Sequence, residues 1–207
     1  MKNFIITIGR QFGSGGREIG QRIAEHYNIP CYDKELLARV AKESGFCEEM
    51  IRNHDERPTN SFLYNLVMDT YSMGYSTGTT YIDMPIGQRI FLAQFDTIKN
   101  VAEEGSCVVV GRCADYALSE LPNCINIFIY ADMDYRIKTV MKRYDLTEAK
   151  AKELINKKDK QRSSYYNYYS NKKWGHASSY HLSIDSGKLG LDNTVELIKN
   201  YINTVMQ

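Results

Sequence analysis

The chain has 207 residues, 43% of them hydrophobic, so it can bury one substantial core and we expect a single folding unit. Its formal net charge is +1, from 26 Lys and Arg against 25 Asp and Glu, which argues against a protein that coats nucleic acid or a membrane surface. Five cysteines without a C-x-x-C pair fit neither a disulfide framework nor a compact zinc site, so we expect reduced thiols.

The first predicted element is a short apolar run, Phe4 to Ile8, which ends in Gly9. Such a run suits a strand that is buried on both faces of a parallel sheet. It is too short for the core of a signal peptide or for a membrane span, so we expect a cytoplasmic protein without a membrane partner. From Arg17 onward, apolar residues at spacings of four predict a helix that ends near Pro30, namely Ile19, Ile23 and Tyr27.

A glycine-rich segment, Gly9 to Gly20, joins this strand to this helix. Glycines permit a tight turn and a close approach of phosphate oxygens, and backbone amides at a helix N-terminus attract anions. Arg17 can donate two parallel hydrogen bonds to a phosphate. We therefore predict a phosphate-binding loop, and the alternative is a flexible turn followed by a solvated arginine. The predicted phosphate-binding residues are Gly13, Ser14, Gly15, Gly16, Arg17 and Glu18.

The middle of the chain has helical periodicity interrupted by a polar loop. Asp33 is a plausible N-cap for a helix that carries Leu36, Leu37 and Val40. Helical spacing recurs over residues 62–71, and Pro85 begins a further apolar run over residues 86–102. We interpret residues 34–100 as a helical insertion. The apolar faces of residues 62–71 and 86–102 could supply a homodimer surface as readily as a core.

Three further compact apolar runs follow and alternate with helical patterns. The predicted strands are Cys107 to Val110, Ile125 to Tyr130 and Tyr180 to Ile184. A closing helix carries a stripe of Val195, Ile198, Ile202 and Val205. This alternation predicts an α/β fold of three layers, α/β/α, around a central parallel sheet of about five strands, with ligands at the carboxyl ends of the strands.

Positive charge is concentrated in one segment of an otherwise acidic chain. Residues 142–173 contain ten Lys or Arg and four Asp or Glu. A solvated helix face is the ordinary explanation, and a segment that closes over a bound anion is the alternative that we favour. Four tyrosines in this segment, Tyr165, Tyr166, Tyr168 and Tyr169, are predicted to pack against the core rather than to stack on a base.

The order of these motifs resembles the cytidylate kinase-like family of P-loop nucleoside monophosphate kinase relatives. The motifs are Ile6-Thr7-Ile8-Gly9 with its glycine loop, Tyr32-Asp33, Val109-Val110-Gly111-Arg112, Ile127-Phe128-Ile129, Lys158-Asp159-x-x-Arg162 and Ile184-Asp185-Ser186. The resemblance implies a P-loop fold and transfer of a phosphoryl group from ATP, with Mg²⁺, to a nucleoside monophosphate, most simply CMP or dCMP. The metal ligands stay unassigned, with Asp33 and Glu18 as candidates.

The resemblance also implies roles for individual residues. The insertion would bind the acceptor, and residues 143–175 would form a basic lid that closes over the transferring phosphoryl group. The catalytic candidates are Arg17, Arg143, Lys158 and Arg162, and the substrate-binding candidates are Asp33, Arg112, Arg136 and Asp185. In sequence alone, Arg112 is equally well explained as a surface arginine, and Asp33 and Asp185 as capping or turn residues.

Two other functions stay open at this level. A nucleotide- or phosphate-binding regulatory module without transfer activity is favoured by the absence of a lysine in the loop. It is also favoured by Val110, which stands where cytidylate kinases carry an aspartate. A kinase for another small acceptor is supported by the Tyr- and Met-rich residues 60–95. Fold alone does not separate these possibilities.

Overall fold

The computed structural model describes residues 3–57 and 84–206. It contains a five-stranded sheet in the order β2-β3-β1-β4-β5, in which all neighbouring strands are parallel. The strands are β1 (Ile5–Arg10), β2 (Cys31–Tyr32), β3 (Cys107–Val110), β4 (Cys124–Tyr130) and β5 (Leu182–Asp185). The predicted parallel sheet of about five strands is therefore confirmed.

The central strand β1 explains why the first apolar run has no polar alternation. Ile5 pairs with Cys107 of β3 and with Cys124 of β4, so both edges of β1 are occupied. Ile5 and Ile6 are both buried, and they belong to cores on opposite faces of the sheet. A strand in this position needs apolar side chains on both faces.

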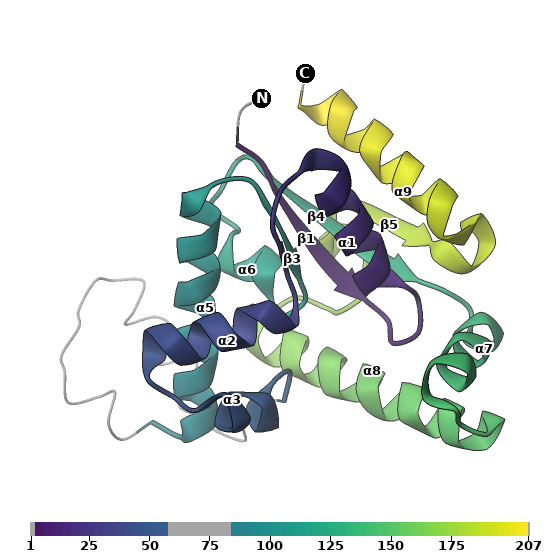
Figure 1. The fold of residues 1–207 in the computed structure, drawn as a ribbon, viewed down its shortest axis with the longest axis horizontal. Coiled ribbons are helices and arrows are strands. Elements are labelled where there is room, and N and C mark those ends of the chain that lie inside the picture. The colour runs from purple at the N-terminus through teal and green to yellow at the C-terminus, as the bar shows by residue number, and fades with distance from the viewer. Residues whose placement is uncertain (1–2, 58–83, 207) are drawn as a thin grey trace.

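Helices cover both faces of the sheet (Figure 1). One face packs against α1 (Gly16–Tyr27) and α9 (Ser186–Val205), whose Ile19, Ile23, Val195 and Ile198 are buried. The opposite face packs against α2 (Lys34–Ser44), α3 (Glu48–His54), α5 (Ile86–Glu104) and α6 (Ala114–Ala117). The three-layer α/β/α prediction is confirmed.

The described part of the predicted insertion is an integral layer of the fold. Helix α5 packs against α2 and α6, and its Ile90, Ile98 and Val101 are buried in the core beneath the sheet. Of the two readings of the apolar stripe over residues 86–102, the structure therefore supports a core. The predicted helix over residues 62–71 lies outside the described residues.

The predicted lid contains a long helix, α8 (Glu148–Ser170), which follows α7 (Met133–Tyr144). Figure 1 shows α8 crossing the carboxyl ends of the central strands. Its N-terminal half packs on α7 through Ala151 and Ile155. Its C-terminal half is anchored in an aromatic cluster, where Tyr169 stacks on Phe91 with ring centroids 3.8 Å apart.

The tyrosine prediction is confirmed, because Tyr165, Tyr166 and Tyr169 are buried in this cluster and Tyr168 packs against it. All five cysteines are free thiols, also as predicted. Element boundaries differ by one or two residues: β1 continues to Arg10 and α1 begins at Gly16. Within residues 3–57 and 84–206, no helix is long and apolar enough to cross a membrane.

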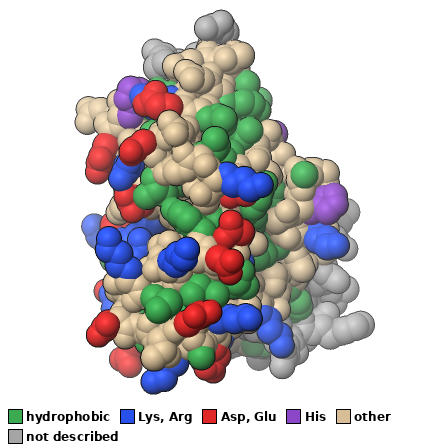
Figure 2. Space-filling view, turned by 90° about the vertical axis from the view of Figure 1, so that its right-hand side faces the viewer, with side chains coloured by type: hydrophobic (Ala, Val, Ile, Leu, Met, Phe, Trp, Pro, Cys, Tyr) green, Lys and Arg blue, Asp and Glu red, His purple; other side chains and the backbone are tan. Residues whose placement is uncertain are grey.

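Charge on the outer surface is mixed. Figure 2 shows the side of the molecule that carries α9 and α7, where side chains of both signs are interspersed and apolar side chains lie between them. The exposed apolar residues of α9 there include Leu189 and Leu197. Neither positive nor negative side chains predominate on this side of the molecule.

Candidate functional site

A cavity of about 320 Å³ lies where the carboxyl ends of β1, β2 and β3 meet α3 and α8. Its wall contains nine Lys or Arg and three Asp or Glu. The charged residues are Arg10, Arg17, Asp33, Lys34, Arg52, Asp55, Glu56, Arg57, Arg112, Arg143, Lys158 and Arg162. The remaining wall is formed by Gln11, Phe12, Gly13, Gly15, Gly16, Tyr144 and Gln161. A wall with this excess of cations favours a ligand with several negative charges.

The glycine-rich loop forms one side of the cavity. Gly13 and Gly15 have φ angles of +85° and +82°, a backbone conformation that favours glycine. A Cβ atom at Gly16 would lie 2.6 Å from the Cβ of Arg10, so glycine is also required where the helix begins. Within the described chain, the amides of Gly15, Gly16 and Arg17 donate no hydrogen bond. Such amides at the start of a helix are available to an oxyanion.

Ser14 and Glu18, which belong to the predicted phosphate-binding loop, do not line the cavity. The hydroxyl of Ser14 is fully buried, 2.9 Å from the carbonyl oxygen of Gln11 and 3.1 Å from that of Ile129. Glu18 faces away and forms an ion pair with Arg22 along α1. The side chain of Ser14 therefore shapes the loop and that of Glu18 pairs on the helix surface, so any contact of these two residues with phosphate is left to their backbone amides.

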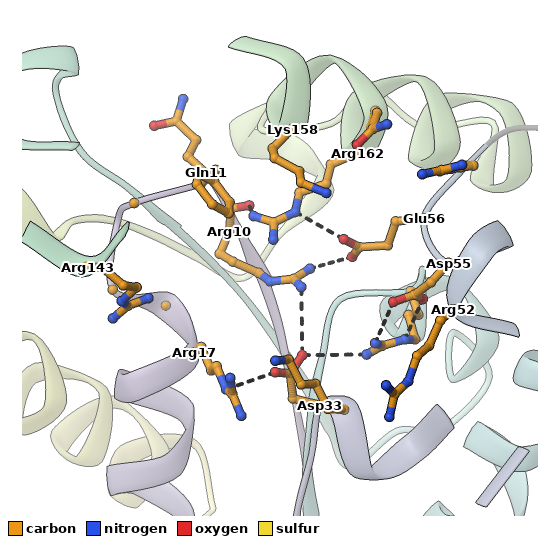
Figure 3. Close-up of a pocket in the computed structure, with 18 of the residues that line it drawn as sticks. Arg10, Gln11, Arg17, Asp33, Arg52, Asp55, Glu56, Arg143, Lys158 and Arg162 are labelled. Carbon is orange, nitrogen blue, oxygen red and sulfur yellow. Dashed lines mark hydrogen bonds and ion pairs between the residues drawn. The ribbon is translucent and has the colours of Figure 1, made fainter. Parts of the chain in front are cut away.

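Asp33 is the carboxylate around which three arginines gather. It occupies the N-cap position of α2, yet its side chain makes no capping hydrogen bond. Its oxygens instead lie 2.9 Å from Nε of Arg17, 3.6 Å from Nη1 of Arg112 and 3.9 Å from Nη2 of Arg10. Asp33 thus positions cationic side chains on the cavity wall, as Figure 3 shows.

Arg112 is held by an unusual backbone and by a buried ion pair. Gly111, Arg112 and Cys113 all have positive φ angles, which turns the chain sharply after β3. Nε and Nη2 of Arg112 donate to the two carboxylate oxygens of Asp55 at 2.8 and 2.9 Å. Burial alone would lower the pKa of Arg112, but Asp55, Glu56 and Asp33 raise it. The surface-arginine alternative is wrong, because only 3% of this side chain is exposed.

A second ion-pair group in the cavity was not predicted from the sequence. Glu56 accepts from Nη1 of Arg10 at 2.6 Å and from Nε of Arg162 at 3.0 Å. Burial raises the pKa of Glu56, but the guanidiniums of Arg10, Arg162 and Arg112 outweigh it and hold that pKa well below its usual range. The available signal for Arg10 was its place directly after a buried strand. Glu56 lies just after α3, and the apolar spacing of this part of the sequence does not predict where it lies relative to the glycine-rich loop.

Arg136 and Asp185, which are predicted to bind substrate, do not line the cavity, and both make structural contacts. Nη1 of Arg136 donates to Oδ2 of Asp159 at 2.5 Å, and the other oxygen of Asp159 accepts from the amide of Phe12 at 2.7 Å. The buried side chain of Arg136 thus connects α7 with α8, and through Asp159 with the loop. Asp185 caps α9 by accepting from the amides of Gly187 and Lys188.

The other predicted cations converge on the cavity. Arg17, Arg143, Lys158 and Arg162 all line it, although they come from α1, the end of α7 and α8. Figure 3 shows Arg143 beside the glycine loop and Lys158 close to Arg162. Arg162 also lies over the ring of Phe12, with its guanidinium carbon 5.5 Å from the ring centroid. The structure therefore brings the four catalytic candidates together.

The described cavity wall does not fit a magnesium ion held by protein ligands. Each of its three carboxylates, Asp33, Asp55 and Glu56, already faces at least one guanidinium. Within residues 3–57 and 84–206, no group of three or more His, Cys, Asp or Glu is placed to hold a metal ion. The groups of the described wall that can neutralise phosphate charge are therefore its arginines and lysines.

Comparison with known proteins identifies the family of this chain. The model of the cytidylate kinase-like family matches residues 5–188. A cytidylate kinase of Methanopyrus kandleri is 24% identical over 213 residues, covering 98% of this chain and 95% of that protein. The crystal structure of an uncharacterized protein from Eubacterium ventriosum is 36% identical, with a TM-score of 0.73 and coverage of 97% of this chain and 98% of that chain.

A more distant structure shares the fold alone. Shikimate kinase from Bacteroides thetaiotaomicron has a TM-score of 0.55 at 11% identity, with coverage of 97% of this chain and 98% of that one. The family match spans the strands whose carboxyl ends form the cavity, together with α8.

Proposed function

Because the chain belongs to the cytidylate kinase-like family, we propose that it transfers the γ-phosphoryl group of ATP to a nucleoside monophosphate, most simply CMP or dCMP. The observation that carries this proposal is the cavity itself. A glycine loop with free amides faces nine Lys or Arg at the carboxyl edge of a parallel sheet. The relationship to a cytidylate kinase over nearly the whole chain supports the nucleotide acceptor.

In this proposal, the glycine loop binds the phosphates of the donor. The amides of Gly15, Gly16 and Arg17 approach the phosphate oxygens, and the Arg17 guanidinium adds charge-assisted hydrogen bonds. Asp33 orients Arg17 for this contact through its 2.9 Å ion pair. The positive end of the α1 dipole adds to the attraction.

The transferring group lies between the loop and α8. Arg143 and Lys158 reach this region from the end of α7 and from α8, where they neutralise negative charge that develops during transfer. Phosphoryl transfer needs positioning and charge neutralisation rather than a covalent nucleophile. The acceptor is held from the opposite wall by Arg112, Arg52 and Arg57, which come from the turn after β3 and from the α3 region.

A regulatory module that binds nucleotide without transferring phosphate is the second candidate. It is favoured by the pairing of every carboxylate on the described cavity wall with a guanidinium, which leaves no unpaired carboxylate there to bind a metal ion. Absence of a loop lysine supports it as well. A kinase for another small acceptor would use the same donor site and differ only at the opposite wall.

One experiment separates these candidates. ATP consumption is measured in a coupled assay with CMP, dCMP, the other nucleoside monophosphates and small hydroxylated acceptors. Turnover with a monophosphate that is lost in Arg17→Ala supports the proposal. Turnover with a different acceptor only would assign another kinase activity. Saturable ATP binding without turnover on any acceptor would favour the regulatory module and contradict transfer.

A further inference from the structure

The carboxylate of Glu56 forms ion pairs with two largely buried guanidiniums that both point toward it (Figure 3). One carboxylate oxygen contacts Arg10 at the end of β1, and the other contacts Arg162 on α8. The three side chains are only 10%, 14% and 15% exposed for Arg10, Arg162 and Glu56. Three separate elements are therefore joined by one carboxylate at the centre of the cavity wall.

Gly111 makes room for this arrangement. A Cβ atom there would lie against Nη1 of Arg10 and Oε1 of Glu56. Nη1 of Arg162 also donates to the carbonyl oxygen of Arg10 at 3.2 Å, which fixes the guanidinium of Arg162 relative to β1. The guanidinium of Arg10 has a second partner as well, because its Nη2 lies 3.9 Å from Oδ1 of Asp33. The positions of the two guanidiniums thus do not depend on Glu56 alone.

The charge balance of this group is incomplete. Glu56 carries a single negative charge, whereas Arg10 and Arg162 carry two positive charges. Asp33 also lies 3.9 Å from Nη2 of Arg10, but its one negative charge is shared with Arg17 and Arg112. Burial lowers the pKa of Arg162, and the neighbouring Arg10 lowers it further. A phosphoryl group offers oxygens from one centre, as a carboxylate does, and it carries more negative charge. It would therefore neutralise the two guanidiniums more completely than Glu56 does.

We propose that Arg10 and Arg162 form a binding site for a phosphoryl oxyanion, and that Glu56 holds this site until the anion enters and displaces it. The inference rests on the proposed function, because it places the transferring phosphoryl group of the donor between these two arginines. Glu56 is then an internal competitor, and the apparent affinity for phosphate includes the free energy needed to displace it.

The test uses inorganic tripolyphosphate as the probe, titrated by calorimetry at constant ionic strength in EDTA. Glu56→Gln removes the competing charge and keeps the shape of the side chain. We expect it to bind the probe about tenfold more tightly than wild type. Asp55→Asn is the matched control, because it makes the same charge change on the same wall but leaves Glu56 between Arg10 and Arg162.

The comparison of the two variants decides the matter. A gain in Glu56→Gln that exceeds the gain in Asp55→Asn by about fivefold or more supports displacement. Equal gains would show a general effect of charge and overturn the proposal, as would an unchanged affinity in Glu56→Gln. Because Glu56→Gln could destabilise the fold, its melting temperature is recorded with and without the probe. We expect a larger shift on binding than in wild type, and an equal or smaller shift would contradict displacement.

Failure of this inference is distinguishable from failure of the proposed function. If wild type turns over a monophosphate but Glu56→Gln binds tripolyphosphate no more tightly than wild type does, displacement is refuted and the kinase activity stands. If Glu56→Gln binds tripolyphosphate more tightly than wild type but wild type turns over no acceptor, the anion site is supported and phosphoryl transfer is refuted.

Discussion

The backbone amide of Phe12 donates a hydrogen bond of 2.7 Å to Oδ1 of Asp159, which joins the glycine-rich loop to α8. The other oxygen of Asp159 accepts from Arg136, whose side chain is 7% exposed. One carboxylate therefore fixes the loop, neutralises a buried guanidinium and holds α8 over the carboxyl ends of the strands. The part of the predicted lid nearest the loop is thus tethered to it.

Asp159→Ala is expected to lower the free energy of unfolding by about 3–5 kcal/mol, because Arg136 is left buried without its carboxylate. The double variant Arg136→Met with Asp159→Leu removes both charges and should recover most of this loss. Urea unfolding of the three proteins measures the effect. A single variant that unfolds at the wild-type urea concentration would show that the pair contributes little.

Arg17→Ala is expected to weaken ATP binding by about 10- to 100-fold, since a charge-assisted hydrogen bond to phosphate is lost. Arg22→Ala is the matched control, because the two side chains lie on the same helix and are both 39% exposed, but Arg22 does not line the cavity. Calorimetric titration of ATP compares them. Equal losses in the two variants would contradict a specific role for Arg17.

Lys158→Ala is expected to lower kcat by about tenfold or more, because a half-buried cation that lines the cavity and faces developing phosphate charge is removed. The adjacent Lys157 is exposed and does not line the cavity, so Lys157→Ala should stay close to wild type. Steady-state kinetics of both variants provide the measurement. Similar kcat values in the two variants would remove Lys158 from the proposed catalytic group.

Gly111→Ala is expected to cost more stability than Gly45→Ala, although the two glycines have similar φ angles of +80° and +76°. At Gly45 an added Cβ meets nothing within 4 Å, so only backbone strain of about 1 kcal/mol is expected. At Gly111 the Cβ also displaces Arg10 and Glu56. Equal unfolding free energies for the two variants would mean that the ion pair tolerates the displacement.

Stability at low pH should report the ion pairs of Glu56. Its pKa is lowered in the folded protein, so its contribution is fully present above the ordinary Glu value of about 4.3 and is lost as pH falls below it. The difference in unfolding free energy between wild type and Glu56→Gln should therefore shrink by up to about 1.4 kcal/mol per pH unit below that value. Urea unfolding from pH 6 to pH 3 measures it, and a constant difference would contradict the assignment.

The fold was largely predictable because its signals are local. Apolar runs such as Cys107 to Val110 mark buried strands, and spacings of four along residues 19–27 mark α1. The sequence did not show whether the apolar face of residues 86–102 packs in the core or forms a homodimer surface, because both give the same spacing of apolar residues. The packing of Ile90 and Ile98 on the sheet depends on topology, which periodicity does not specify.

Two signals in the sequence pointed to cavity residues: a position beside a strand end or the loop, and the concentration of positive charge in residues 142–173, which contains Arg143, Lys158 and Arg162. Arg17, Asp33 and Arg112 have such positions, and all three line the cavity. Arg10 and Glu56 were missed because their contact joins residues 46 positions apart in the sequence. The contact also needs the space that Gly111, from a third part of the chain, leaves beside it. The ion pair of Arg136 with Asp159 was not predicted, because a basic residue near a basic segment resembles a phosphate ligand, and its partner becomes apparent only when α7 packs on α8.

The central claim is that the cavity binds phosphoryl oxyanions through the loop amides and the surrounding cations. Calorimetric titration of ATP into the wild-type chain, in EDTA and again with MgCl₂, tests it most directly. We predict saturable one-to-one binding in both buffers, with an affinity that falls by about tenfold or more in Arg17→Ala. Absence of saturable binding in both buffers would contradict the claim.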